Sequence, residues 1–239
     1  MQLPYNKSFH LIKKRNIVII WSAKAACTTV NYMYFTHEKL IKSALQNTNW
    51  IHDYRKKYQK KQCKLKRLII DLIPPTKYIH FCVNPYRRAI SSYIHGMCRN
   101  YLPDKHKNIS FHDFLIRIDS GEIEPNPHHN LQSFYKDDYK LITTVKMEYM
   151  NKELDKINKK FKLHFKPHKN ENIKVKSNKI NFFIGNDKWE TFQDNVPSNY
   201  TMFYNRDIKK LVEKIYRNDI KNLGYTWNMF VTYESNKQP

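Results

Sequence analysis

The arrangement of apolar positions along the chain predicts short buried strands separated by longer segments with helical spacing. Residues 17–21 (IVIIW) form a continuous β-branched and aromatic run of strand length, which is typical of a strand buried on both faces. Residues 77–83 form a second run and end at Asn84-Pro85, a turn signal. Residues 139–145 predict a third strand, and residues 180–184 predict a short fourth strand.

The segments between these strands carry apolar residues at helical spacing, and two of them have clear start or stop signals. Ser110 is a good N-cap, with Asp113 three positions later and Gly121 as a stop. Asp207 is a candidate cap for the last helix, and Gly224 suits its C-terminal end. The predicted helices cover residues 28–44, 86–97, 110–118, 148–161 and 207–223.

Strands that alternate with helices indicate an α/β fold with a central, mainly parallel sheet flanked by helices. In such sheets, ligands bind beyond the carboxyl ends of the strands. The residues after Trp21 and those after Val83 both follow a strand end. We therefore expect functional side chains in these two stretches.

A chain of 239 residues with 41% hydrophobic content fits one domain, residues 1–239, with a basic lead-in at 1–16 and a C-terminal tail at 226–239. The basic stretch 50–67 predicts a solvated helix, and the open alternative is that it contacts an anionic substrate. Residues 164–179 are polar and lack periodicity, which predicts an exposed loop.

The charge balance points to an anionic partner. The chain has 43 Lys and Arg against 21 Asp and Glu, a net charge of +22, which favours nucleic acid, an anionic polysaccharide, a phosphate-rich cofactor or an acidic membrane surface. The four cysteines show no zinc spacing and fit reduced thiols. Without a transmembrane-length run or a signal-peptide pattern, we expect a soluble, intracellular protein whose compartment the sequence does not specify.

The strongest candidate chemistry lies directly after the first strand. The loop Ser22-Ala23-Lys24-Ala25-Ala26 leads into a helix that begins near Thr28 and Thr29. The first amide groups of a helix have no intrahelical partners, so they form a ready anion site, to which Lys24 adds a charge and the two threonines add hydroxyl donors. The loop is not a Walker A motif, because it lacks GxxxxGK[ST].

Four stretches resemble sulfotransferases, most closely the membrane-type carbohydrate O-sulfotransferase branch. Residues 24–29 (KAACTT) are similar to that branch's 5′-phosphosulfate loop, and residues 84–93 (NPYRRAISSY) to its 3′-phosphate motif. Residues 128–132 (HHNLQ) resemble the family segment His-x-x-Pro-Gln, and residues 216–225 its C-terminal Tyr-x-x-Asp-x-x-x-Phe-Gly-Tyr. The matches occur in the family's order and span the chain from about residue 17 to residue 225.

The resemblance implies a P-loop-NTPase-like three-layer core and transfer of sulfate from 3′-phosphoadenosine 5′-phosphosulfate (PAPS) to a hydroxyl of an anionic or neutral carbohydrate, with no metal. Lys24 would stabilise charge on the leaving 5′-phosphate, which residues 24–29 (Lys24, Ala25, Ala26, Cys27, Thr28 and Thr29) would hold. Ser91 and Arg88 would bind the 3′-phosphate. Either His128 or His129 would accept the acceptor's proton.

The chain departs from the family pattern at two positions. Ala26 replaces a glycine in the first loop, and Val83 replaces the arginine that would grip the 3′-phosphate, for which Arg87, Arg88 or Arg99 could substitute. One alternative is therefore a degenerate sulfotransferase fold that binds anionic glycans without catalysis. Another is a nucleic-acid-binding protein, supported by the charge and by 14% aromatic residues but by no recognition motif, so nucleic acid is the less favoured partner.

Overall fold

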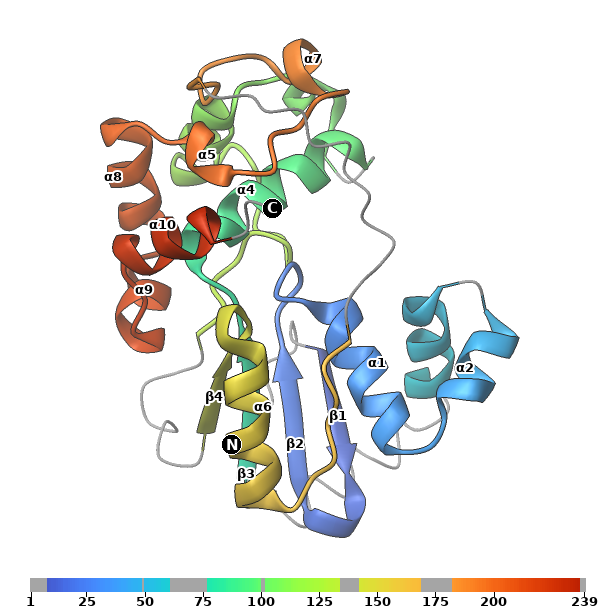
Figure 1. Cartoon of the computed structure of the whole chain (residues 1–239). Coiled ribbons are helices and arrows are strands. Elements are labelled where there is room, and N and C mark those ends of the chain that lie inside the picture. The colour runs from blue at the N-terminus through green and yellow to red at the C-terminus, as the bar shows by residue number, and fades with distance from the viewer. Residues whose placement is uncertain are drawn as a thin grey trace. The chain divides into compact units, whose positions relative to one another are not determined.

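The computed structural model describes residues 8–48, 50–60, 77–99, 102–133, 142–168 and 182–236. The chain divides into two compact units. The first comprises Met1–Cys82 and Phe134–Asn170, and the second comprises Val83–Ser133 and Glu171–Pro239. Figure 1 shows the elements of each unit.

The first unit contains a four-stranded sheet in the order β1-β2-β3-β4. Its strands are β1 (Ser8–Ile12), β2 (Ile17–Trp21), β3 (Lys77–Cys82) and β4 (Ile142–Lys146). The β2–β3 and β3–β4 pairs are parallel, and β1 runs antiparallel to β2. The prediction of an α/β fold with a mainly parallel sheet is therefore confirmed.

Helices pack against one face of this sheet. They are α1 (Cys27–His37) and α6 (Met150–Phe161) (Figure 1). Helix α2 (Ile41–Asn47) lies against α1. The unit also contains a helical stretch at residues 51–60 and short 3-10 turns at Lys13–Arg15 and Met147–Tyr149. Alternate strand residues Ile19, Trp21 and Phe81 point toward these helices and contribute to one buried cluster with them. The described residues that cluster on the other face, such as Val18 and Ile20, all come from strands.

The three-layer arrangement stays a prediction, because the described helices of the first unit contribute to the cluster on one sheet face only.

The second unit is built from helices around α4 (Pro85–Cys98), which lies against α5 (Phe111–Asp119), α8 (Arg206–Ile215) and α10 (Trp227–Ser235). Its other elements are 3-10 turns at Asp104–His106 and Tyr200–Phe203, and the helices α7 (Trp189–Phe192) and α9 (Arg217–Leu223). Aromatic residues dominate the shared core, including Tyr86, Tyr93, Phe111, Phe203 and Phe230.

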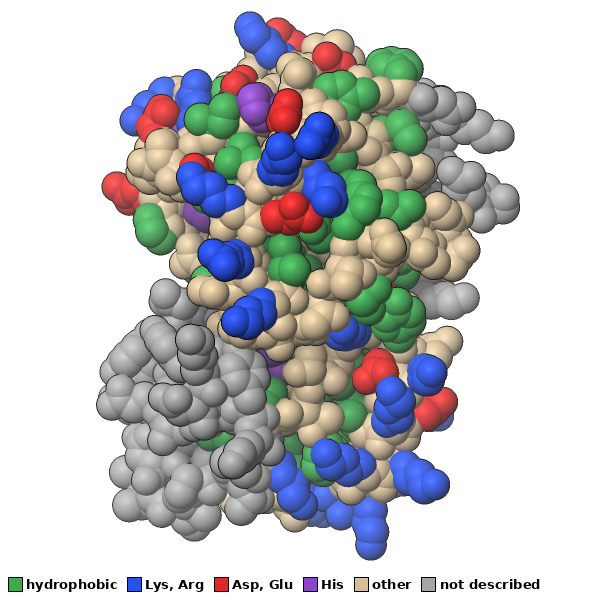
Figure 2. Space-filling model, turned by 90° about the vertical axis from the view of Figure 1, so that its left-hand side faces the viewer, with side chains coloured by type: hydrophobic (Ala, Val, Ile, Leu, Met, Phe, Trp, Pro, Cys, Tyr) green, Lys and Arg blue, Asp and Glu red, His purple; other side chains and the backbone are tan. Residues whose placement is uncertain are grey.

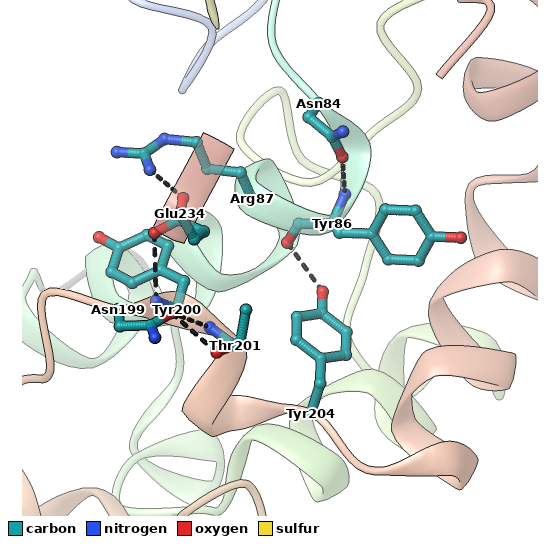
Figure 3. Close-up of polar contacts among 8 residues, drawn as sticks. All are labelled: Asn84, Tyr86, Arg87, Asn199, Tyr200, Thr201, Tyr204 and Glu234. Carbon is teal, nitrogen blue, oxygen red and sulfur yellow. Dashed lines mark hydrogen bonds and ion pairs between the residues drawn. The ribbon is translucent and has the colours of Figure 1, made fainter. Parts of the chain in front are cut away.

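A buried ion pair ties α4 to α10 in this unit. Arg87 on α4 pairs with Glu234, whose side chain has no exposed surface. The Arg87 guanidinium lies over the rings of Tyr200 and Tyr233, and Glu234 also accepts a hydrogen bond from the Tyr200 backbone (Figure 3). Beside the pair, the Tyr204 hydroxyl donates to the Tyr86 carbonyl at 2.8 Å. These contacts hold the half-buried Arg87 side chain against α10 and the two tyrosine rings.

The start of α5 follows the sequence signals closely. The Ser110 side chain accepts a hydrogen bond from the Asp113 amide, as predicted for an N-cap, and Gly121 lies just beyond the helix with a φ of +79°. Gly224 ends α9 in the left-handed conformation, also as predicted.

Several predicted boundaries were wrong. The lead-in at 1–16 contains β1, and the tail at 226–239 contains α10. The predicted helix 28–44 is two helices, because the chain turns through Lys39 at a φ of +58°. The last predicted helix divides at Tyr216 into α8 and α9, and its cap is Asn205 rather than Asp207.

Other predictions fall partly outside the described residues. Residues 61–67 of the basic stretch, 139–141 of the third strand, 169–179 of the exposed loop and 180–181 of the fourth strand lie there. Residues 182–184, which are described, are not a strand. Among the described helices, none combines the length and the apolar character that a membrane span requires.

Candidate active site

The loop after β2 turns the chain sharply into α1. Lys24 and Ala26 both adopt the left-handed region, with φ values of +61° and +54°. The Ala25 amide donates to the Ser22 carbonyl at 3.1 Å, which closes the turn, and Val30 donates to the Ala26 carbonyl at 3.0 Å to begin the helix. No described side chain caps α1. Its first amide groups are therefore available to an anion.

Ala26 stands in a conformation that suits glycine. A left-handed φ costs an L-residue roughly 1–2 kcal/mol, and here it occurs at the N-cap of α1. Ala26, which stands where the resembling motif has glycine, is thus a source of local strain in this turn.

Sequence analysis missed a histidine beside this loop. The Nε2 atom of His52, in the helical stretch 51–60, lies 3.0 Å from the Thr28 hydroxyl and 3.7 Å from the Cys27 sulfur. Burial lowers the pKa of His52 to about 4, assisted by the positive charges of nearby Arg55, Lys56 and Lys24. His52 is therefore neutral at pH 7 and orients the Thr28 hydroxyl.

The basic stretch 50–67 thus begins next to the candidate anion loop. Arg55 belongs to the same helical stretch, and its guanidinium donates to the Ser8 hydroxyl at 2.8 Å. Burial lowers the pKa of Arg55, and the neighbouring Cys27 opposes that effect. The only sequence signal for this proximity was the histidine within a basic run, which does not specify a tertiary contact.

In the second unit, α4 begins with the Asn84 side chain accepting a hydrogen bond from the Tyr86 amide. Arg88 is buried, and its guanidinium donates to the carbonyls of Asn130 (2.6 Å) and Pro127 (3.1 Å). Arg88 thereby holds in place residues 124–130, which include His128 and His129 and are called the histidine loop below. These two bonds use two of the five N–H donors of the guanidinium. Ser91, the other candidate 3′-phosphate ligand, is half-buried on α4.

The two candidate histidines have different surroundings. His128 is half-buried, and its Nδ1 atom lies 2.7 Å from the Asn126 side-chain oxygen, which also accepts the His128 amide. That oxygen is an acceptor, so Nδ1 carries the proton and Nε2 keeps its lone pair. His129 is buried, its Nε2 atom lies 2.9 Å from the Glu124 carbonyl, and burial lowers its pKa.

Three of the four resembling stretches come together in the second unit. The Gln132 carboxamide accepts from the Val83 amide at 3.0 Å and donates to the Val83 carbonyl at 2.8 Å. The Asp219 carboxylate accepts from the backbone amides of Gln132 (2.7 Å) and Ser133 (2.6 Å). Because Asp219 and Gln132 have no exposed surface, these buried bonds link the segment before α4, the stretch 128–132 and α9 to one another.

The predicted site residues are therefore divided between the two units. The first unit holds Lys24 to Thr29 in one turn, with His52 added. The second unit brings the start of α4 together with the histidine loop through Arg88. Within the described part of the chain, no cluster of three or more His, Cys, Asp or Glu is arranged to hold a metal ion.

Comparison of the chain with models of known families, with curated proteins and with solved structures finds no match.

Proposed function

We propose that this protein is a PAPS-dependent sulfotransferase that transfers sulfate to a hydroxyl of a carbohydrate. The observation that carries the proposal is the strained loop 22–26, with Lys24 at its centre, leading into the uncapped N-terminus of α1. Backbone strain and exposed amides beside a lysine are features of anion-binding turns. The order of the four resembling stretches narrows the anion to the 5′-phosphosulfate of a nucleotide.

In this proposal the first unit stabilises the negative charge that develops during sulfate transfer. Sulfuryl transfer resembles phosphoryl transfer, in which positioning and electrostatics supply most of the catalysis. In the proposed reaction the acceptor oxygen forms a bond to sulfur while the bond from sulfur to the 5′-phosphate oxygen breaks. Lys24 would stabilise the charge that develops on that leaving oxygen. The amides at the start of α1 and the Thr28 hydroxyl would hold the 5′-phosphate.

His128 is the better candidate for the base. Its Nε2 atom carries the lone pair that proton abstraction needs, because Nδ1 is committed to Asn126. His129 has one nitrogen directed at the Glu124 carbonyl, and the other is buried without a partner among the described residues. In the proposal His129 supports the loop, and His128 accepts the hydroxyl proton.

A transfer assay tests the proposal. Labelled PAPS is incubated with a panel of sulfated and unsulfated glycans, and transfer to at least one of them is expected. Lys24→Ala should abolish transfer while leaving the circular dichroism spectrum unchanged, whereas Lys42→Ala, on the exposed surface of α2, should retain it. Equal transfer by the Lys24→Ala protein would exclude the proposed role of the loop.

A second candidate is a degenerate sulfotransferase fold that binds anionic glycans without catalysis. The observation that favours it is that two of the three arginines that could substitute for the one absent at Val83 are already engaged. Arg87 pairs with buried Glu234, and Arg88 is bonded to two loop carbonyls. Glycan binding by a protein that transfers no sulfate to any glycan in the panel would favour this candidate.

Nucleic-acid binding is supported by the net charge of +22 and by the 14% aromatic content, and by no recognition motif. Figure 2 shows lysine and arginine side chains spread over the visible face with acidic side chains among them. A nucleic-acid site of this charge typically concentrates its cations on one face or along one helix. Binding to any duplex, with strong salt dependence and without bisphosphate binding, would support this function.

A further inference from the structure

A basic cavity lies beside the start of β2 in the first unit, whereas the candidate loop follows the end of this strand. It has a volume of about 810 Å³, within the range of small-molecule sites. The end of β1 and the 3-10 turn Lys13–Arg15 form one side of it. The C-terminal ends of α1 and α6 form the other. The cavity adjoins the start of β2, whereas the loop 22–26 follows its end, so the five-residue strand separates them by roughly 16 Å.

The cavity combines an apolar wall with a cationic rim. Leu11, Ile12 and Tyr34 are buried side chains of the wall. Four cations line the opening: Lys14, Arg15, Lys39 and Lys162, all of them exposed. Within the described ranges, none of these four forms an ion pair.

The positive charge exceeds what the fold itself needs. Two helix C-termini together carry a charge of about −1, and among the described residues Glu38 supplies the only carboxylate in the lining. Four lysine and arginine side chains therefore leave a surplus of about two positive charges before either histidine is counted. Cations that only complement helix ends would not produce this surplus.

Two histidines add donors to the same cavity. His37 and His164 both line it. The pKa of His37 is lowered, mainly by burial. The nearby Glu38 carboxylate opposes this effect, and the charges of His164 and Arg15 add to it. The Nδ1 atom of His37 is buried with no hydrogen-bond partner in the described part of the chain. An unpaired buried nitrogen in a cationic cavity is a group that a bound ligand can satisfy.

We propose that this cavity is a second anion site that binds a compact molecule carrying two or more phosphate or sulfate groups. Clustered lysines with an arginine suit such groups, because arginine grips an oxyanion with two parallel hydrogen bonds and lysines add point charges. The volume of about 810 Å³ suits a small molecule. The proposal does not depend on the proposed sulfotransferase activity, because no cavity residue belongs to the candidate active site.

Isothermal titration with sodium tripolyphosphate and with sucrose octasulfate tests the site at low salt. The key variant is Lys39→Asn/Lys162→Asn, because asparagine tolerates the left-handed backbone that both lysines adopt. The matched control is Lys42→Gln/Lys152→Gln, which removes two exposed charges of the same unit outside the cavity. Lys24→Ala reports on binding at the loop.

The proposal predicts that wild type and the control bind at least one probe equally, and that the cavity variant binds it at least about tenfold more weakly. Any loss in Lys24→Ala measures separate binding at the loop. The stronger of the two probes identifies the phosphate or the sulfate class. Equal binding by the cavity variant, loss of binding only in Lys24→Ala, or no binding to either probe would overturn it.

The NMR signals of His37 and His164 provide a readout that needs no variant. Both signals should shift in the wild-type protein when the binding probe is added. Unchanged histidine signals under saturating probe would contradict the proposal even if the cavity variant failed to fold.

Discussion

The side chain of Gln132 pairs with both backbone polar groups of Val83, accepting from its amide and donating to its carbonyl. Val83 follows the end of β3 and has no further strand partner there, so the carboxamide takes the place of a neighbouring strand. Asp219 then holds the Gln132 backbone. Both backbone polar groups of Val83 are thus paired with a buried side chain.

Replacing Gln132 should therefore destabilise the protein severely. Gln132→Ala leaves the amide and carbonyl of Val83 buried without partners, and each such loss costs about 1–3 kcal/mol. We expect a loss of about 2–4 kcal/mol in the free energy of unfolding, measured by urea denaturation. Gln59→Ala, which removes a single partly exposed hydrogen bond to the Phe9 carbonyl, is the control and should cost under about 1 kcal/mol. Similar losses in both variants would show that the Gln132 contacts are weak.

Relief of the strain at Ala26 should stabilise the protein. Glycine adopts the left-handed region without steric cost, although it loses more conformational entropy on folding. Ala26→Gly should therefore raise the free energy of unfolding by about 0.5–1 kcal/mol and leave bisphosphate binding intact. Thermal and urea denaturation measure the first effect. Destabilisation by glycine would indicate that the turn is not strained as described.

Stability should fall in mildly acidic solution because of His52. Its pKa is about 4 in the folded protein and 6.5 in the unfolded chain. Between these values only the unfolded state binds the proton, so stability is full above pH 6.5 and declines as the pH falls toward 4. The decline from this group is up to about 3 kcal/mol. Urea denaturation at pH 7.5 and pH 4.5 measures it.

The comparison with His52→Asn isolates this contribution from that of the other acidic and basic groups. The variant should lose less stability than wild type over the same pH interval. Parallel pH profiles for the two proteins would refute the assignment of a lowered pKa to His52.

Breaking the Arg87–Glu234 pair should also be costly. Burial works against the charge on Arg87, but the Glu234 carboxylate and the rings of Tyr200 and Tyr233 raise its pKa above the usual value. Arg87→Met would leave Glu234 charged in the interior, so we expect a loss of about 3–5 kcal/mol. Lys56→Met, which breaks an exposed pair with Asp53, should cost under about 1 kcal/mol. A loss for Arg87→Met as small as that would mean the pair is not structurally important.

Local signals in the sequence were sufficient for much of the fold. The apolar runs of β2 and β3 and the Ser110 cap each depend on neighbouring residues, and they were predicted from those residues. β1 was missed because it contains the polar residue His10 and lies within the basic, polar lead-in. The structure buries that histidine against the Tyr34 ring, 3.7 Å between centroids, and bonds it to Asn31.

The candidate site was predictable only in part, for the same reason. The loop 22–29 is contiguous, so its lysine and hydroxyl groups could be found by inspection. The approach of His52 to Thr28 joins residues 24 positions apart through tertiary packing, which no local pattern encodes. The ion pair between Arg87 and Glu234 joins residues 147 positions apart and was equally unpredictable from the sequence. It removes one candidate substitute for the missing arginine.

The most direct test of the central claim is the binding of adenosine 3′,5′-bisphosphate, measured by isothermal titration with a thermal shift alongside. The account predicts saturable one-to-one binding that raises the melting temperature. It also predicts that Lys24→Ala weakens binding at least about tenfold, whereas Lys42→Ala leaves it unchanged. Absence of any binding or thermal shift in the wild-type protein, or equal binding by Lys24→Ala, would contradict it.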